Sequence, residues 1–353
     1  MFNLLNDTLY SWRYDAQGNV THSPTGTDYD HTNGYGPIAA FESYYNRLTQ
    51  SFSWLASQTQ IEEGLSQFST DYADAFYVAS DYTLDYGFSG AATNDHILSV
   101  AGGFSGKTGK GKDVVILDTP VELIEGTTDT WQPLYSGDHS VKLGSGADLV
   151  MSLTYDDNTL FGQKGNDVMF AFGHNNYAHG GRGHDTIFTV NLFQDSNSVL
   201  IGGRGQDTLI ALGQGSATLN GGRGADNLVG MTTENVLNGG RGNDHLWAAG
   251  LKNDLTGGRG ADQFIFTQNA ELDNEARISI VRDFQVGIDY IGLGYNDDVF
   301  NITNDFAGNI SYTSEGTNLI VQTDFYGTIV FENLTAQDQN NLINSFVDTF
   351  LIA

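Results

Sequence analysis

Gly180-Gly-Arg-Gly-His-Asp185 opens a stretch in which the hexapeptide Gly-Gly-Arg-Gly-x-Asp occurs five times, ending at Asp185, Asp207, Asp226, Asp244 and Asp262. Only glycine readily adopts the positive φ angles that such a tight loop needs. A glycine-rich loop that ends in a carboxylate allows backbone carbonyl groups and the aspartate to converge on calcium, a hard cation that prefers oxygen ligands. The five copies therefore predict a calcium-binding repeat.

Weaker copies extend the repeat toward the N-terminus. They end at Asp167, Asp148 and Asp113, while Asp129 and Asp95 keep the interval without the glycines. Successive aspartates from Asp95 to Asp262 are 16 to 22 residues apart, a fixed period that is typical of stacked coils. The pattern predicts a mainly β protein, a parallel β-roll or β-solenoid of about ten coils of roughly 18 residues.

Apolar residues at two fixed positions support the coils. The residue two places after each aspartate should point inward, and it is apolar in every coil: Ile97, Val115, Trp131, Val150, Met169, Ile187, Leu209, Leu228, Leu246 and Phe264. The residue seven places before the aspartate is apolar as well: Leu160, Ala178, Leu200, Leu219, Leu237 and Leu255.

These repeats resemble the RTX (repeats-in-toxin) family, whose nonapeptide Gly-Gly-x-Gly-x-Asp-x-U-x, with U a large aliphatic residue, builds a parallel β-roll. The resemblance implies calcium ions between neighbouring loops. In that family each coil carries two nonapeptides, whereas here the return half, such as Phe172-Gly-His-Asn-Asn176, has no loop aspartate. We therefore expect calcium along one edge only. We expect the other edge to carry asparagines, at 158, 176, 235 and 253.

The expected calcium-site residues are the glycines, arginines and aspartates of the motif. They are Asp113, Gly144, Gly146, Asp148, Gly162, Gly165, Asp167, Gly180, Arg182, Gly183, Asp185, Gly202, Arg204, Gly205, Asp207, Gly221, Arg223, Gly224, Asp226, Gly239, Arg241, Gly242, Asp244, Gly257, Arg259, Gly260 and Asp262. The seven loops from Asp148 to Asp262 leave six gaps between neighbours, so about six ions are expected.

The charge balance agrees with a cation-loaded protein. The chain has 43 acidic and 15 basic residues and a formal net charge of -28, which opposes compaction unless carboxylates are neutralised. Six divalent ions would bring -28 + 12 to -16. Empty loops of stacked aspartates would repel one another, so we expect calcium binding and folding to be coupled. At the calcium affinities of extracellular modules, the chain would fold outside the cell.

Features at both ends of the chain predict export by type I secretion. Residues 1–7 lack the basic and apolar regions of a cleavable signal, whereas Phe346–Ala353 looks like the C-terminal signal of RTX proteins. The chain has no cysteine, so no disulfide is needed. No apolar stretch reaches the length of a membrane span.

Three regions are expected. Residues 1–85 are rich in aromatic side chains, and helical spacing over 38–55 and 61–77 predicts a helical cap or a partner-binding face. Residues 86–270 form the roll. Residues 271–353 form a β cap, because Ile280–Leu293 is similar to the segment that closes serralysin-type rolls and because alternating runs at Leu319 and Thr328 predict strands.

Catalytic signatures are missing from the sequence, so an enzyme is disfavoured. There is no His-Glu-x-x-His, and Gly87-Phe-Ser-Gly and Gly103-Phe-Ser-Gly lack the spacing of a nucleophile elbow. Gly106-Lys-Thr108 only imitates a phosphate loop. A hemophore-like ligand carrier, with His31 and Tyr82 as haem ligands, remains an alternative.

Five of the nine arginines occupy one place in the motif, three residues before the aspartate: Arg182, Arg204, Arg223, Arg241 and Arg259, with Lys164 continuing the row. They either extend into water and pair with nearby acids, or bind a periodic polyanion such as an acidic polysaccharide or lipopolysaccharide. Nucleic acid is not expected, since the surrounding charge is negative.

Together these features favour a secreted, calcium-dependent structural protein of the cell surface, extracellular matrix or surface layer, able to self-assemble. The alternatives that stay open are a polysaccharide-active enzyme carried on the roll and the ligand carrier.

Overall fold

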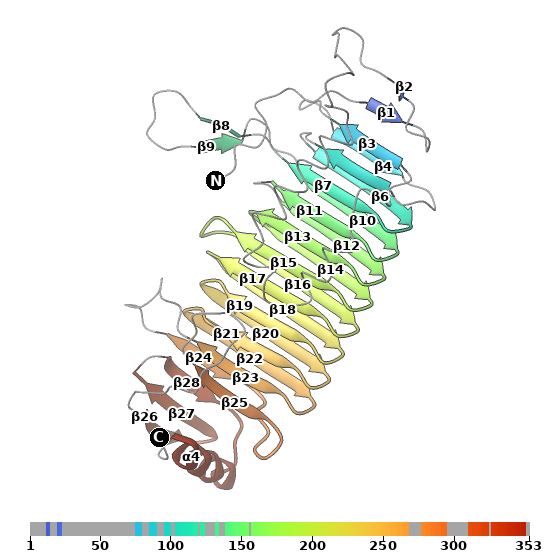
Figure 1. Ribbon diagram of the computed structural model, residues 1–353. Coiled ribbons are helices and arrows are strands. Elements are labelled where there is room, and N and C mark those ends of the chain that lie inside the picture. Colours follow the sequence, from blue (N-terminus) through green and yellow to red (C-terminus); the bar gives the residue numbers. More distant parts are fainter. Residues whose placement is uncertain are drawn as a thin grey trace. The chain divides into compact units, whose positions relative to one another are not determined.

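The computed structural model describes residues 12–14, 20–22, 75–79, 85–89, 95–99, 103–118, 121–123, 131–133, 138–154, 157–267, 277–294, 310–324 and 326–350. The chain divides into two compact units, Met1–Thr186 and Ile187–Ala353. In each unit most of the described strands are parallel and alternate along the chain between two sheets (Figure 1), as the sequence predicts for a β-solenoid.

In the first unit, one sheet has the strand order β3-β5-β7-β11-β13 and the other has the order β4-β6-β10-β12-β14. Every neighbouring pair within these two sets is parallel. The bounds in the first sheet are Ala75–Ala79, Asp95–Ser99, Val114–Asp118, Leu149–Leu153 and Val168–Gly173. Those in the second are Asp85–Ser89, Gly103–Lys110, His139–Ser145, Asn158–Lys164 and Asn176–Arg182.

The second unit repeats this arrangement. Its first sheet has the order β17-β19-β21-β23-β25 (Thr208–Gly213, Asn227–Met231, His245–Ala248, Gln263–Thr267 and Tyr290–Gly294). Its other sheet has the order β16-β18-β20-β22-β24 (Asn197–Arg204, Ser216–Arg223, Glu234–Arg241, Lys252–Arg259 and Ile278–Val281). Strand β15 (Thr186–Asn191) begins at the boundary between the units.

The core lies between the two sheets and is built from the two positions identified in the sequence. The residue two places after the loop aspartate is buried in nine of the ten expected coils, and the residue seven places before it is buried in every motif coil from Leu160 to Leu255. Because side chains alternate along a strand, the residues between them face outward. The alternating burial of β16, β18 and β22 follows this rule.

The expected number of coils is wrong. The structure has about seven turns at a spacing near 19 residues, and the coil expected at Asp129 does not separate β7 from β11. Strand β7 pairs directly with β11, with Val115 opposite Val150. The intervening chain holds β8 (Val121–Leu123) and β9 (Trp131–Pro133), which form their own antiparallel pair. Trp131 therefore belongs to this pair and not to the stacked sheets.

The expected helical cap does not appear in the described part of residues 1–85. Strands β1 (Trp12–Tyr14) and β2 (Val20–His22) pair antiparallel, and β1 adds to the edge of β3. Ala75, Phe76 and Tyr77, expected at the end of a helix, lie in β3 instead. The rest of the predicted helices, 38–55 and 61–74, lies outside the described residues.

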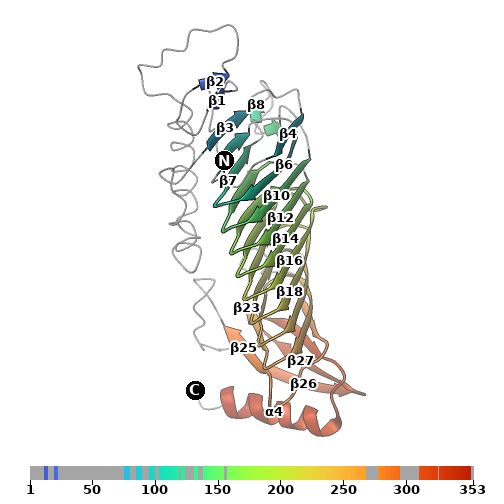
Figure 2. The same cartoon turned by 90° about the vertical axis from the view of Figure 1, so that its right-hand side faces the viewer.

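The C-terminal strands confirm the expected β structure and add a helix. Strand β28 (Gly327–Phe331) is parallel to β24, and β27 (Asn318–Thr323) and β26 (Ile310–Glu315) continue antiparallel. Helix α4 (Ala336–Phe350) follows and lies beside them at the end of the second unit (Figure 2). It is too short to span a membrane, and no other described helix is long and apolar enough.

Asparagines line the edge opposite the motif loops, as the sequence predicts. Asn158 Nδ2 donates to Asn176 Oδ1 at 2.8 Å, and Asn235 Nδ2 donates to Asn253 Oδ1 at 2.9 Å. The four side chains are buried. Stacked amides that donate to the next turn satisfy buried polar groups that would otherwise be costly. This edge is therefore held by hydrogen bonds within the protein.

Candidate calcium-binding edge

Each motif loop leads from a strand of the second sheet into a strand of the first. In the loop of Asp226, Gly222 has φ +101° and Gly224 has φ +141°, values at which a side chain would strain the backbone. A Cβ at either residue would also collide with the backbone of the preceding loop. The two glycines are thus required by both the turn and the close stacking of loops.

The first glycine of the motif has a different role, because it borders a pocket of oxygen atoms. A Cβ on Gly221 would lie 2.5 Å from Asp226 Oδ2 and 2.8 Å from the carbonyl oxygen of Gly239 in the next loop. A Cβ on Gly239 would lie 2.5 Å from Asp244 Oδ2 and 2.7 Å from the carbonyl oxygen of Gly257. A carboxylate oxygen of one loop and a carbonyl oxygen of the next therefore both border the space beside this glycine, and both are the kind of ligand that calcium prefers.

The loop aspartates form a ladder in each unit. One carboxylate oxygen, Oδ1, accepts the backbone N–H of the preceding loop aspartate. In the first unit these bonds run from Asp113 to Asp148, from Asp148 to Asp167 and from Asp167 to Asp185, at 2.8 to 3.0 Å. In the second unit they link Asp207, Asp226, Asp244, Asp262 and Asp289 at 2.8 to 3.0 Å. Every carboxylate is thus held in one orientation by its neighbour.

The other carboxylate oxygen is left for a ligand. Within the described part of the chain, Oδ2 has no hydrogen-bond partner in Asp148, Asp167, Asp226, Asp244 and Asp262, although each side chain is almost fully buried. Burying a carboxylate without a counter-charge is costly. Burial raises the pKa of Asp148 to about 9 and the pKa of Asp226 and Asp244 to about 7. A bound cation would remove this penalty.

These oxygen donors fit calcium better than a transition metal. The donor set is carboxylate and carbonyl oxygen, which suits a hard cation with many ligands. Among the described residues, no three His, Asp or Glu side chains come close enough to hold an ion by themselves. A site at this edge must therefore draw much of its coordination from backbone carbonyls, which the glycine loops bring together.

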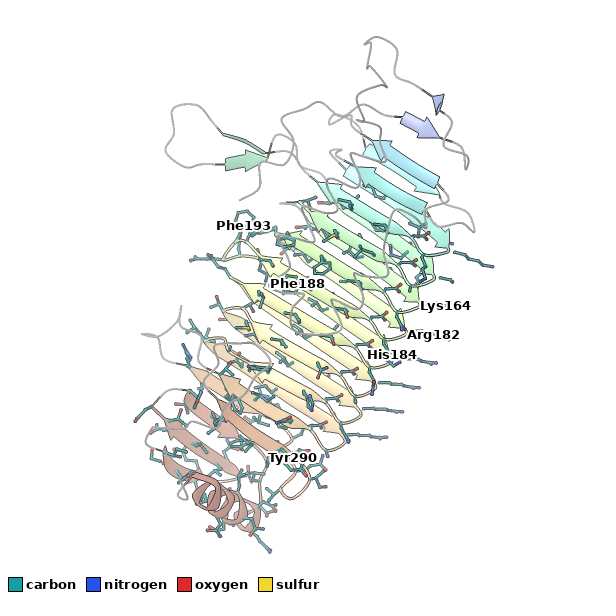
Figure 3. The ribbon with its side chains drawn as sticks, viewed as in Figure 1. Lys164, Arg182, His184, Phe188, Phe193 and Tyr290 are labelled. Atoms are coloured by element: carbon teal, nitrogen blue, oxygen red, sulfur yellow. The ribbon has the colours of Figure 1, made fainter. Side chains whose placement is uncertain are left out.

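The motif arginines contribute backbone atoms and not side chains to the edge. The Gly205 N–H donates to the carbonyl oxygen of Arg223 at 2.8 Å, and the Gly224 N–H donates to that of Arg241 at 2.8 Å. Their guanidinium groups are exposed. In the first unit, Figure 3 shows Lys164 and Arg182 extending outward from the ribbon. The side chains of this row therefore face solvent.

Sequence reasoning missed the last member of the ladder. Asp289 accepts the Asp262 N–H at Oδ1 and the Gln285 N–H at Oδ2, at 3.0 and 2.7 Å. Nearby, Asp283 accepts the N–H groups of Gly257 and Gly258 at 2.9 and 2.8 Å. Asp289 lies 27 residues after Asp262 and has no glycine motif before it. Its only sequence signal is the closing segment that contains it.

The segments that imitate catalytic motifs are parts of strands. Gly87-Phe-Ser lies within β4, and Gly103-Phe-Ser-Gly-Lys-Thr lies within β6. The Thr108 side chain is buried and donates to the carbonyl oxygen of Leu143. Neither segment forms the turn that a nucleophile elbow or a phosphate loop requires. His31 and Tyr82 lie outside the described residues.

Two sheets of parallel strands, joined by glycine loops that stack buried aspartates, define the class of calcium-binding β-rolls. A family model for the RTX calcium-binding nonapeptide repeat matches residues 154–187, 212–246 and 229–264. The chain thus carries RTX calcium-binding repeats that form a β-solenoid. The loops of Asp148 and Asp207 lie outside the matched residues but have the same aspartate bonding. No curated protein matches the chain.

Proposed function

We propose that this protein is a secreted structural component of the cell surface or extracellular matrix, which folds when it binds calcium after export. The observation that carries the proposal is the ladder of buried loop carboxylates, in which one carboxylate oxygen accepts the backbone N–H of the preceding loop aspartate. The second oxygen of Asp148, Asp167, Asp226, Asp244 and Asp262 has no partner in the described structure. Such an edge gains most from a divalent cation that is abundant outside the cell.

In this proposal the ligands are the loop aspartates together with carbonyl groups of the motif glycines and of the residues between them. The predicted set from Asp148 to Asp262 would hold about six ions, one between each pair of neighbouring loops. Calcium would supply charge neutralisation and link successive turns. The protein would supply preformed oxygen donors on one edge, while the asparagine ladder holds the other edge.

Two features of the described structure support a structural role. The parallel strands occupy a large part of the described residues, and the described strands contain no nucleophile elbow or phosphate loop. RTX repeats suggest type I secretion. We extend the proposal to residues 346–353 as the export signal, of which 346–350 form the end of α4. For a role in the matrix, we further propose that copies of the chain self-assemble through residues 1–85 or along the roll.

The test is a calcium titration of the full chain, starting from protein freed of metal by chelation. Circular dichroism should change from a largely unfolded to a β-rich spectrum as calcium rises through about 0.1 to 1 mM. Magnesium at the same concentration should not replace calcium, because it demands near-octahedral geometry and keeps its waters. A direct measurement of bound metal should find about six ions per chain.

Electron microscopy of the same samples tests the structural role separately. Ordered sheets or filaments with calcium, and none after chelation, would support a matrix or surface-layer component. Discrete particles in both conditions would contradict that role and leave calcium-coupled folding intact. A chain whose spectrum and melting behaviour ignore chelation would contradict the folding mechanism itself.

A further inference from the structure

The second unit carries a row of four arginines that the calcium loops do not explain. Arg204, Arg223, Arg241 and Arg259 end strands β16, β18, β20 and β22, and each is paired in register with the next. Neighbouring strands lie about 4.8 Å apart, so the four side chains leave the sheet at one regular interval. All four are exposed.

The loop does not require arginine at this position. In the first unit, Ser145 and Lys164 occupy the equivalent place, and their carbonyl oxygens accept the N–H groups of Gly111 and Gly146 at 2.9 Å. The hydrogen bond from Gly205 to the Arg223 carbonyl is the same interaction. This backbone hydrogen bond forms whether the residue is serine, lysine or arginine. The repeated guanidinium groups therefore need another explanation.

No counter-charge within the described structure pairs with the row. Ion pairs among the described residues of the second unit include those of Lys252 with Glu234, and of Arg282 with Asp254 and Glu332. None of the four row arginines makes an ion pair with a described residue. Like charges one strand apart repel one another, so the row lowers the stability of the chain by itself. A bound anion with repeated charges would reverse that effect.

A second row beside the arginines suggests what kind of anion fits. Asn220, Asn238 and Thr256 stand three residues before Arg223, Arg241 and Arg259 and are in register with one another on the outward face of the same sheet. Amide and hydroxyl groups donate and accept hydrogen bonds, as sugar hydroxyls do. A line of cations beside a line of neutral polar groups matches a polymer that carries both carboxylates and hydroxyls.

We propose that this face, the arginine row with its asparagine and threonine neighbours, binds a linear acidic polysaccharide laid along the stacking direction. Guanidinium forks hold carboxylate oxygens in pairs. Single contacts at an exposed rim are weak, but a polymer engages several at once, which raises its apparent affinity. The proposal goes beyond the structural role above, because it names a partner and the residues that contact it.

Two other polyanions fit this face less well. Single-stranded nucleic acid relies on aromatic side chains for base stacking, and β16, β18, β20 and β22 contain none. The formal net charge of -28 also repels a densely charged polymer. A membrane surface requires a broad basic patch or an apolar face for insertion, whereas the row is one residue wide.

The experiment measures binding of the calcium-loaded full chain to a short hyaluronan oligosaccharide by calorimetry. Hyaluronan is a linear glycan with a carboxylate on alternate sugars. The same oligosaccharide with its carboxylates reduced to alcohols is the neutral control. We expect binding to the acidic form only, and affinity should fall as salt rises. Comparable binding of the neutral form, or no binding of either, would overturn the proposal.

Variants of the arginine row test whether these residues bind the oligosaccharide. The triple change Arg223→Gln, Arg241→Gln and Arg259→Gln should weaken binding at least about tenfold. The triple change to Lys should retain only part of it, because the charge remains but the paired contacts of the guanidinium forks are lost. The matched control removes three charges elsewhere, through Lys107→Gln, Lys142→Gln and Lys252→Gln, and should change affinity less than about twofold.

Each variant is first shown to fold with calcium by circular dichroism, so that a failure of calcium-coupled folding is seen separately from a failure of glycan binding. If the row variant with three Arg→Gln changes and the control variant with three Lys→Gln changes lost the same affinity, only net charge would matter. That result would overturn the assignment. Tighter binding of single-stranded DNA, or of vesicles containing phosphatidylglycerol, than of hyaluronan would replace the glycan with that partner.

Discussion

At the scale of single residues, the loop carboxylates carry most of the dependence on calcium. In Asp244, Oδ1 accepts the Asp226 N–H at 2.8 Å, while Oδ2 lies beside Gly239 and the carbonyl of Gly257. Changing Asp244 to asparagine keeps an oxygen for the first bond and removes the charge. The loss should therefore appear in metal binding more than in the geometry of the ladder.

We expect Asp244→Asn to raise the calcium concentration at the midpoint of folding by roughly threefold or more, because binding and folding are coupled. Circular dichroism during calcium titration measures this midpoint. Asp195→Asn is the matched control, since Asp195 is exposed in the turn at the opposite edge and the change in charge is the same. Equal shifts for the two variants would argue against a metal site at Asp244.

A second residue-scale prediction concerns Gln163, which has φ +75° at the place where the strongest motifs have glycine. A non-glycine residue in this region is strained. Gln163→Gly should stabilise the calcium-loaded protein by about 0.5 to 1 kcal/mol. Urea unfolding at saturating calcium measures the change. Gln206→Gly, at a loop position without positive φ, should instead destabilise it, because glycine adds entropy to the unfolded chain.

At the scale of elements, the two edges of the solenoid are held by different interactions. The loop edge contains buried carboxylate oxygens without hydrogen-bond partners in the described structure, whereas the asparagine edge is satisfied by hydrogen bonds within the protein. Asn235 accepts from Thr232 Oγ1 at 2.7 Å and donates to the Thr232 carbonyl at 3.0 Å and to Asn253 Oδ1 at 2.9 Å. The amide thereby links two turns.

We expect Asn235→Ala to destabilise the protein by about 2 to 4 kcal/mol, because it leaves buried polar groups without partners. The number of bound calcium ions should not change. Urea unfolding and metal analysis measure the two quantities. Asn238→Ala, on the exposed outer face of β20, is the control and should change stability by less than about 0.5 kcal/mol. Lost ions in Asn235→Ala would mean that the edges are not independent.

The sequence predicts an element correctly where several repeated positions support the same assignment. The motif loops and the buried positions Leu200, Leu219 and Leu237 follow from several repeated positions, and the structure confirms the burial. Asp129 is assigned to a coil from its spacing and from apolar Trp131 two places later, without the glycines of the motif. Spacing cannot distinguish a coil from an excursion of similar length, and the direct pairing of β7 with β11 excludes that coil.

Helix α4 could have been found from its cap. The Asp338 N–H donates to Thr335 Oγ1 at 3.1 Å, and the Thr335 hydroxyl also bonds Asp338 Oδ2 at 2.6 Å. A threonine followed three residues later by an acid is a helix start signal. The expectation of an export signal in the last residues leaves this helix start signal unused. Asp289 had no comparable local signal, since its role in the ladder depends on pairing 27 residues away.

At the scale of the whole molecule, we expect the stacked carboxylates to make folding depend on both calcium and pH. Burial raises the pKa of Asp148 to about 9 and the pKa of Asp167, Asp185, Asp226 and Asp244 to about 7, well above the usual range of an aspartate. In each case the calcium-free fold binds protons more tightly than the unfolded chain. The resulting stability is fully present below about pH 4 and is lost as pH rises through about 7, and for Asp148 through about 9.

We therefore expect the calcium-free chain to keep more β structure at pH 5 than at pH 8. We expect the opposite trend for calcium affinity, because protons compete with calcium for the same oxygens. Circular dichroism of chelated protein and calcium titrations at the two pH values measure these effects. If the chelated chain were equally unfolded at both, the aspartates would not be buried together without metal.

From β6 to β23 the described connections on the glycine side stay short, whereas the excursion after β7 and the turn between β15 and β16 lengthen the asparagine side. The glycine-loop edge fixes the spacing between successive turns, whereas the opposite edge can accept inserted residues. We expect a peptide inserted near Phe193 to be displayed on the surface without altering that spacing.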